Sequence, residues 1–207
     1  GWIKIIAITI ALLTFLLSLV PAVASDKKDE RYNEMLKLQQ SDLVIKLDSK
    51  KFTEYILKDR DYDVVIYYTL SDKCDFCVAM EEELKQVANS FIKANKHIKE
   101  DNDKRPVFFA KIEFSEETKN IFMKSNYTSV PILNLANKQV VKHYRKTGQI
   151  KYPKAVEWRA STQDFLDAGR ILEYVNKITE QEIEISYTLD RNLKGVSIIF
   201  AILGILF

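Results

Sequence analysis

The residues with the clearest chemistry in this 207-residue chain are its two cysteines, Cys74 and Cys77. The apolar run from Val64 to Tyr68 precedes them, and apolar residues then recur every three or four positions, which indicates a strand, a short loop and a helix. Cys77 then lies in the first helical turn, where the helix dipole favours a thiolate over a thiol. The pattern predicts a site for thiol–disulfide exchange.

Two other uses of the cysteine pair are less consistent with the sequence. A structural zinc site takes four ligands, yet the only histidines, His97 and His143, are single and far apart. A purely structural disulfide between neighbours this close would close a very small loop and remove little entropy from the unfolded chain. We therefore expect exchange chemistry, no metal and no cofactor.

The beginning of the sequence indicates the compartment. Lys4 precedes an uncharged run from Ile5 to Val20, and small residues at Ala22 and Ala24 form a signal-peptidase type of site. We expect a signal peptide over residues 1–24, with a retained membrane anchor as the alternative. Either one would deliver the following segment to an oxidising compartment, where such a cysteine pair can cycle.

The other end of the sequence is also apolar. Residues 193–207 are expected to begin a transmembrane helix that the sequence truncates, because a full span takes about 20 residues. Arg191 and Lys194 flank this segment on the side that would face away from the cytoplasm, against the positive-inside tendency. Between the two ends we expect a folded domain over residues 25–178 and an extended juxtamembrane tether over residues 179–192.

The composition excludes several classes of protein. The chain has 31 basic and 29 acidic residues without a basic stripe, so we expect no nucleic-acid partner. Only Gly148, Gly169 and Gly195 lie between the apolar ends, too few for a phosphate-cradling loop.

The order of predicted elements matches an α/β protein with a thioredoxin-like fold. The expected helices cover residues 31–40, 50–58, about 75–96 and 116–124, with a last helix from a cap at Ser161 or Thr162 through Val175. The expected strands cover residues 43–47, 64–69, 107–113, 132–135 and 140–144, the last two as an antiparallel hairpin.

Val130 and Pro131 add a second signal for this fold. A proline cannot donate to a strand ladder, so Pro131 must lie at the start of its strand. In the thioredoxin fold this proline is cis and faces the cysteine pair, and the residue before it offers its backbone to an extended peptide. We expect both features here.

Several stretches resemble a more specific family. They are Tyr67–Leu70 before the cysteines, the acidic Glu81–Glu83, VANSF at residues 87–91, FFAKIEF at 108–114 and Asn126–Pro131. Together they resemble the thioredoxin-domain oxidoreductase accessory subunit of the eukaryotic oligosaccharyltransferase, a family that includes tumour suppressor candidate and magnesium transporter relatives. The resemblance covers roughly residues 43–175 and extends to the apolar C-terminal segment.

This resemblance implies a mechanism and a location. Cys74 would attack and Cys77 would resolve, the two would form a Cys74–Cys77 disulfide, and Val130 with Pro131 would dock peptides. The subunit would aid N-glycosylation through transient mixed disulfides or peptide contacts with nascent glycoproteins, especially cysteine-containing ones. Glycan transfer would be carried out by another subunit of the complex. The chain would lie in the endoplasmic reticulum membrane with its thioredoxin domain in the lumen.

Departures from ordinary thioredoxins leave alternatives open. No Trp precedes Cys74, no Gly-Pro separates the cysteines, and the charge of Asp75 opposes a thiolate at Cys74, which favours slow exchange. One alternative is a free-standing, membrane-anchored disulfide oxidoreductase or isomerase of the lumen. Another is a non-enzymatic peptide-binding module or a transport protein.

A final motif concerns modification of the chain itself. Asn126-Tyr127-Thr128 is an N-glycosylation sequon, provided that its loop is exposed. It lies five residues before Pro131, so a glycan would crowd the expected peptide groove. We expect Asn126 to remain unmodified.

Overall fold

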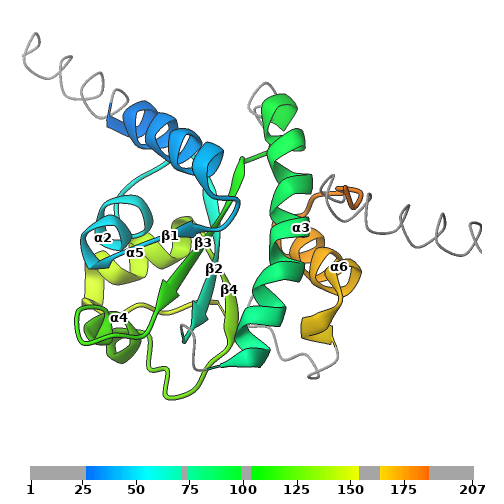
Figure 1. The fold of residues 1–207 in the computed structure, drawn as a ribbon. Helices are drawn as coiled ribbons and strands as arrows, with labels where there is room; N and C mark the ends of the chain where they lie inside the picture. The colour runs from blue at the N-terminus through cyan, green and yellow to red at the C-terminus, as the bar shows by residue number, and fades with distance from the viewer. Residues whose placement is uncertain (1–26, 71–73, 99–103, 154–163, 187–207) are drawn as a thin grey trace, which may run out of the picture.

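A mixed four-stranded sheet lies at the centre of the part of the chain that the structure describes (Figure 1). The computed structural model describes residues 27–70, 74–98, 104–153 and 164–186. The sheet order is β1-β3-β2-β4, in which β1 and β2 run parallel to β3, and β4 runs antiparallel to β2. The strands are β1 Ile45–Lys46, β2 Asp63–Thr69, β3 Val107–Glu113 and β4 Ile132–Ala136.

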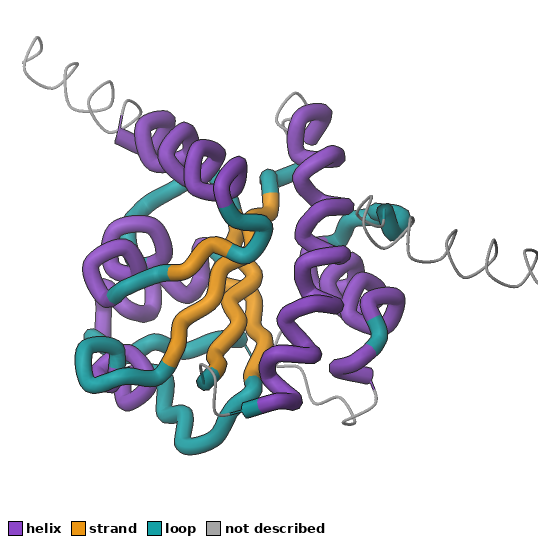
Figure 2. Tube along the Cα trace, in the orientation of Figure 1, coloured by secondary structure: helices purple, strands orange, loops and turns teal. Residues whose placement is uncertain are grey.

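Helices cover both faces of this sheet. In Figures 1 and 2, α3 and α6 lie on one side, and α2 and α5 lie on the other. A helix over residues 27–41 precedes β1. The other helices are α2 Ser49–Ile56, α3 Asp75–Ile98, α4 Lys119–Lys124, α5 Lys138–Thr147 and α6 Ala168–Thr179. This arrangement confirms the predicted thioredoxin-like fold.

The core explains why β2 and β3 are apolar along most of their length. Every residue of β2 after Asp63 is buried, as is β3 from Val107 to Ala110, because helices cover the central strands from both sides. Aromatic rings join the layers: Phe108 lies edge-on to Tyr62, with ring centroids 5.1 Å apart, and to Tyr32 of the first helix at 5.6 Å.

The predicted strand over residues 140–144 is wrong, and so is the hairpin that contained it. The segment forms α5, whose N-cap Asn137 accepts hydrogen bonds from the backbone amides of Gln139 and Val140. The helix ends at Gly148, whose φ of 72° is the left-handed conformation that glycine adopts readily. Asn137 and Gly148 are residues that commonly cap a helix, and the ten residues between them suit a short helix. These two caps favour a helix over a strand in this segment.

Other boundaries differ in smaller ways. α3 continues into the predicted loop as far as Ile98, and α4 begins at Lys119 rather than Glu116. α6 begins after Asp167, whose side chain accepts from the amides of Gly169 and Arg170. The expected caps Ser161 and Thr162 lie outside the described residues.

The predictions for the two ends concern mostly residues outside the described ranges, including 1–24 and 193–207. Among the described residues, no helix has the length and apolar character to cross a membrane. The predicted tether begins where α6 ends, and its residues 180–186 have neither helix nor strand. This part packs on α3, because the amide of Ser186 donates to Ser90 and Asn89 donates to the Ser186 carbonyl.

Candidate thiol–disulfide site

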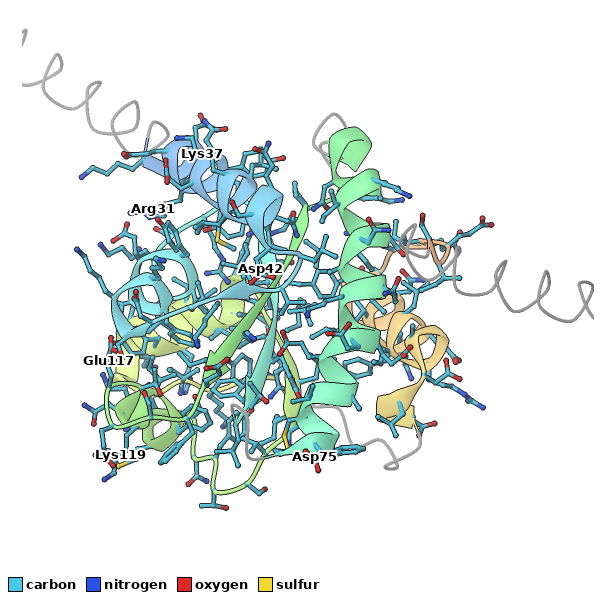
Figure 3. The ribbon with its side chains drawn as sticks, viewed as in Figure 1. Arg31, Lys37, Asp42, Asp75, Glu117 and Lys119 are labelled. Atoms are coloured by element: carbon cyan, nitrogen blue, oxygen red, sulfur yellow. A yellow bond between two sulfur atoms is a disulfide. The ribbon has the colours of Figure 1, made fainter. Side chains whose placement is uncertain are left out.

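The two cysteines form a disulfide at the N-terminus of α3, with Cα atoms 5.2 Å apart. Cys77 is 1% exposed, whereas Cys74 is partly exposed. The backbone amide of Cys77 points at the Cys74 sulfur, with an N–S distance of 3.1 Å. After reduction the same amide would donate to a Cys74 thiolate, which the helix N-terminus also favours. In Figure 3 the disulfide lies beside the exposed Asp75.

Tyr67 of β2 fixes the position of Cys77 through a hydrogen bond. Its hydroxyl donates a 2.9 Å hydrogen bond to the backbone carbonyl of Cys77, and its side chain is fully buried. Burial raises the pKa of Tyr67 far above its usual range, and the charge of Glu81 adds to this. Tyr67 therefore stays a neutral donor at physiological pH and ties β2 to the first turn of α3.

A charged pair lies one helical turn beyond Cys77. Lys111 of β3 contacts both carboxylate oxygens of Glu81, at 2.8 and 2.9 Å, and Glu113 at 3.3 Å. Lys111 is also the register partner of Tyr67. Burial alone would lower the pKa of Lys111, but the hydrogen bonds and charges of Glu81 and Glu113 outweigh it and raise the pKa. A positive and a negative charge thus lie near the buried cysteine.

The role of this pair is not predicted by the sequence. The available signals were a lysine that follows four apolar residues in β3 and a glutamate four residues after Cys77 on one helix. What the sequence did not reveal was that these two side chains, 30 residues apart, meet each other.

The loop before β4 reaches the end of the sheet at which the disulfide lies. The Val130–Pro131 peptide bond is cis, as the sequence predicts. Ile132, which follows it, pairs with Tyr68, and β2 leads from Tyr68 toward Cys74. Val130 and Cys74 both pack on the core. The structure therefore brings Val130, Pro131 and the disulfide to one end of the sheet.

Tyr68 supports this loop from the core. Its hydroxyl lies 2.7 Å from the Tyr152 hydroxyl and 3.0 Å from Ser125 Oγ. Its ring meets Tyr127 edge-on at 4.8 Å. Burial raises the pKa of Tyr68 to about 12, so these contacts are made between neutral hydroxyl groups at physiological pH.

Apolar side chains are exposed around the same end of the sheet. Leu70 follows β2, Phe114 follows β3 and Val78 follows Cys77, and all three are more than a third exposed. The amide of Phe114 donates to the Thr69 carbonyl, which holds the ends of β2 and β3 together. Leu70 and Phe114 directly follow the paired ends of two neighbouring strands, so this end of the sheet offers apolar contacts to an extended peptide.

Asn126 is exposed and has a φ of 57°, in the loop between α4 and β4. It lines a cleft of about 480 Å³ together with Tyr127, His143 and Tyr152. The exposure meets the condition for glycan attachment, and the expectation that Asn126 is unmodified stays a prediction.

Within the described ranges, no three side chains among His, Cys, Asp and Glu form a group that could hold a metal ion.

The chain is similar to known proteins in sequence and fold. A model of the "OST3 / OST6 family, transporter family" matches residues 33–207. No curated protein sequence matches the chain significantly.

Solved structures with a similar fold include two thioredoxins and one disulfide-isomerase domain. Spinach chloroplast thioredoxin f (long form) is 18% identical, with a TM-score of 0.37, and the match covers 50% of this chain and 72% of that one. Thioredoxin f2 of Chlamydomonas reinhardtii is 16% identical, with a TM-score of 0.42 and coverage of 67% and 99%. The first thioredoxin domain of mouse protein disulfide-isomerase A4 is 18% identical, with a TM-score of 0.40 and coverage of 66% and 76%.

Proposed function

This chain belongs to the OST3/OST6 family, and we propose that it serves an oligosaccharyltransferase complex by holding nascent polypeptides at the Cys74–Cys77 site. Holding would keep nearby Asn-x-Ser/Thr acceptors unfolded while another subunit transfers the glycan. The thioredoxin-like domain would work in the lumen of the endoplasmic reticulum, where a disulfide persists.

The proposed capture step is a disulfide exchange. A substrate thiolate attacks Cys74 Sγ, a substrate–Cys74 bond forms, the Cys74–Cys77 bond breaks, and Cys77 leaves as a thiolate that then takes a proton. Release reverses the step: Cys77 loses its proton, attacks Cys74, and the substrate leaves as a thiolate that is protonated. Capture and release together oxidise nothing, so the cycle needs no outside oxidant.

One observation carries this proposal: the partly exposed Cys74 lies at the end of the sheet where apolar side chains are exposed. Attack at Cys74 is favoured because Cys77 is covered. The exposed Leu70, Val78 and Phe114 would hold a peptide non-covalently beside the cis Val130–Pro131 bond. Peptides without cysteine would then bind weakly, and peptides with cysteine would be retained longer.

The test combines co-purification with glycan occupancy. We expect the full-length chain, purified in mild detergent, to bring the catalytic subunit with it. Cells lacking the chain should lose occupancy at a subset of acceptors near cysteines, and Cys74→Ser/Cys77→Ser should not restore it. A chain that purifies alone, with occupancy unchanged by its loss, would instead indicate the free-standing oxidoreductase.

The Glu81–Lys111 pair leads to a prediction about the lifetime of the mixed disulfide. Glu81→Gln removes a negative charge near Cys77 and should favour its thiolate, whereas Lys111→Met should disfavour it. We expect peptide release from a preformed Cys74 mixed disulfide to become about threefold to tenfold faster in the first variant and slower in the second. Stopped-flow release followed against pH should show the two profiles displaced in opposite directions.

Glu82→Gln provides a matched control. Glu82 neighbours Glu81 in sequence, but its side chain is 62% exposed and its partner is Lys85 at 2.8 Å. Its replacement should leave the release profile unchanged. If Glu81→Gln and Lys111→Met displace the profile in the same direction, the pair acts only through stability and not through its charges.

A further inference from the structure

A second candidate site lies at the end of the sheet away from the disulfide. A cleft of about 600 Å³ is lined by seven basic side chains and only two acidic ones. It lies beside the start of β2 and the end of β4, where Val64 pairs with Ala136. The seven residues of β2 separate it from the cysteine loop by about 20 Å.

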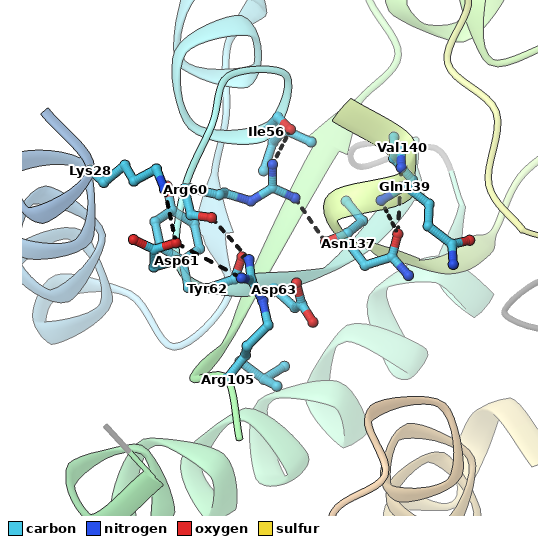
Figure 4. A network of polar contacts seen from close by, with 12 residues as sticks. Lys28, Ile56, Arg60, Asp61, Tyr62, Asp63, Arg105, Asn137, Gln139 and Val140 are labelled. Atoms are coloured by element: carbon cyan, nitrogen blue, oxygen red, sulfur yellow. Dashed lines mark hydrogen bonds and ion pairs between the residues drawn. The ribbon is translucent and has the colours of Figure 1, made fainter. Parts of the chain in front are cut away.

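Arg60 forms the buried part of this cleft. It is 4% exposed, and its guanidinium donates to the carbonyls of Ile56 and Ala136, the latter at 2.8 Å (Figure 4). Its Nε has no hydrogen-bond partner, and no carboxylate among the described residues lies within 4.0 Å of the guanidinium. Burial accordingly lowers the pKa of Arg60. A buried cation without a counter-charge is costly, and a nearby anion would relieve that cost.

The neighbouring carboxylates are already engaged elsewhere. Asp63 pairs with Arg105 at 3.0 Å, Asp61 with Lys28 at 3.3 Å, and Asp59 with Arg145 at 2.7 Å. None of them pairs directly with Arg60, which keeps only a longer-range attraction to Asp63 and whose guanidinium carbon lies 5.5 Å from the centroid of the Tyr62 ring.

α5 supplies further positive charge. Lys138, Lys142 and Lys146 recur every four residues, which places them along one face of the helix, and all three line the cleft exposed. Among the residues that the structure describes, none of them forms an ion pair with a carboxylate.

From the buried Arg60 and the lysine stripe of α5 we infer that this cleft binds a phosphate group. Arginine and lysine together suit phosphate oxygens, through paired N–H donors and through point charge respectively. The volume lies in the range of sites for small molecules, so a compact multivalent oxyanion fits better than a flat protein surface. The phosphate belongs either to a free phosphorylated metabolite or to a phospholipid headgroup. The inference is independent of the thiol site.

The test uses the full-length chain in detergent micelles and inorganic diphosphate as the probe. Binding is measured by calorimetric titration at constant ionic strength, so the sodium chloride concentration is lowered as diphosphate is added. We expect saturable binding and a rise in melting temperature, because the bound anion compensates Arg60. Lys138→Ser/Lys142→Ser should weaken binding about tenfold or more.

Lys119→Ser/Lys177→Ser is the matched control, since it removes the same charge from exposed positions on α4 and α6 outside the cleft. It should leave binding of diphosphate unchanged. Flotation with phosphatidylcholine vesicles, with and without phosphatidylserine, separates the two sources. Preference for anionic vesicles that the α5 variant and diphosphate both abolish assigns a lipid headgroup, and diphosphate binding without that preference assigns a free phosphate.

Three results would overturn the inference. Diphosphate would have no more effect than chloride, or the α5 and control variants would lose affinity equally, or the cleft would bind an acidic peptide such as polyglutamate but not diphosphate. Each result is distinct from a failure of the proposed thiol chemistry, because Cys74→Ser leaves this cleft intact.

Discussion

Replacement of Cys77 by serine is expected to leave the chain linked to its polypeptide partners through Cys74. With Cys77 absent, nothing inside the chain can attack the bond between Cys74 and a substrate, so the mixed disulfide is not resolved. We expect at least about tenfold more adduct than in the wild type after exposure to a peptide carrying an activated disulfide. Non-reducing electrophoresis and mass spectrometry of the linked peptide measure this directly.

Cys74→Ser is the control, because it keeps one cysteine but leaves the buried one. Cys77 is 1% exposed and its carbonyl is held by Tyr67, so it should capture little substrate without local opening. Loss of the short disulfide loop should cost little stability in either variant. Equal trapping by Cys74→Ser and Cys77→Ser would show that the assignment of an attacking and a resolving cysteine is wrong.

The parts of the fold that the sequence predicted are those with strong local patterns. β2 is continuously apolar, α3 has a regular apolar face after Cys77, and Pro131 can occupy only the start of a strand. The structure of the segment at Val140 is harder to predict, because a short apolar run fits either a strand or a helix. Its helix is decided by the caps at Asn137 and Gly148.

The parts of the sites that the sequence did not predict depend on contacts between distant segments. Glu81 and Lys111 meet only because α3 crosses β3. Arg60 is buried because Ala136, 76 residues later, supplies a carbonyl for it. Local patterns do not encode such pairings. A charged residue inside a predicted core strand, as Lys111 is, marks where a partner must exist.

The buried tyrosine cluster behind the peptide loop should be the most sensitive part of the fold to substitution. Tyr68 is fully buried, and its ring lies against Phe52, Phe122 and Tyr127. Tyr68→Ala should lower the free energy of unfolding by about 3–5 kcal/mol, as truncation of a buried aromatic does. Denaturant unfolding followed by circular dichroism measures this loss.

Tyr68→Phe separates the hydroxyl from the ring. It keeps the packing but leaves the hydroxyls of Tyr152 and Ser125 without their shared partner, at an expected cost of about 1–3 kcal/mol. Tyr144→Phe, at a partly exposed position on α5, should change stability by less than about 0.5 kcal/mol. An equal effect of the two phenylalanine variants would show that the hydroxyl cluster contributes nothing specific.

The same cluster predicts how stability depends on alkaline pH. Burial raises the pKa of Tyr68 to about 12 from a usual value of 10.0, so the folded state holds a proton that the unfolded chain has already released between these values. The stabilisation is therefore complete below pH 10 and is lost as the pH rises through 12, by up to roughly 3 kcal/mol. Tyr68→Phe removes this titrating group, so the stability of that variant should fall less steeply over that interval.

Because Tyr68 pairs with Ile132 directly after Pro131, peptide affinity should fall together with stability in Tyr68→Ala. A Tyr68→Ala chain that unfolds more easily yet binds peptide with unchanged affinity would show that the loop at Pro131 is positioned without the cluster.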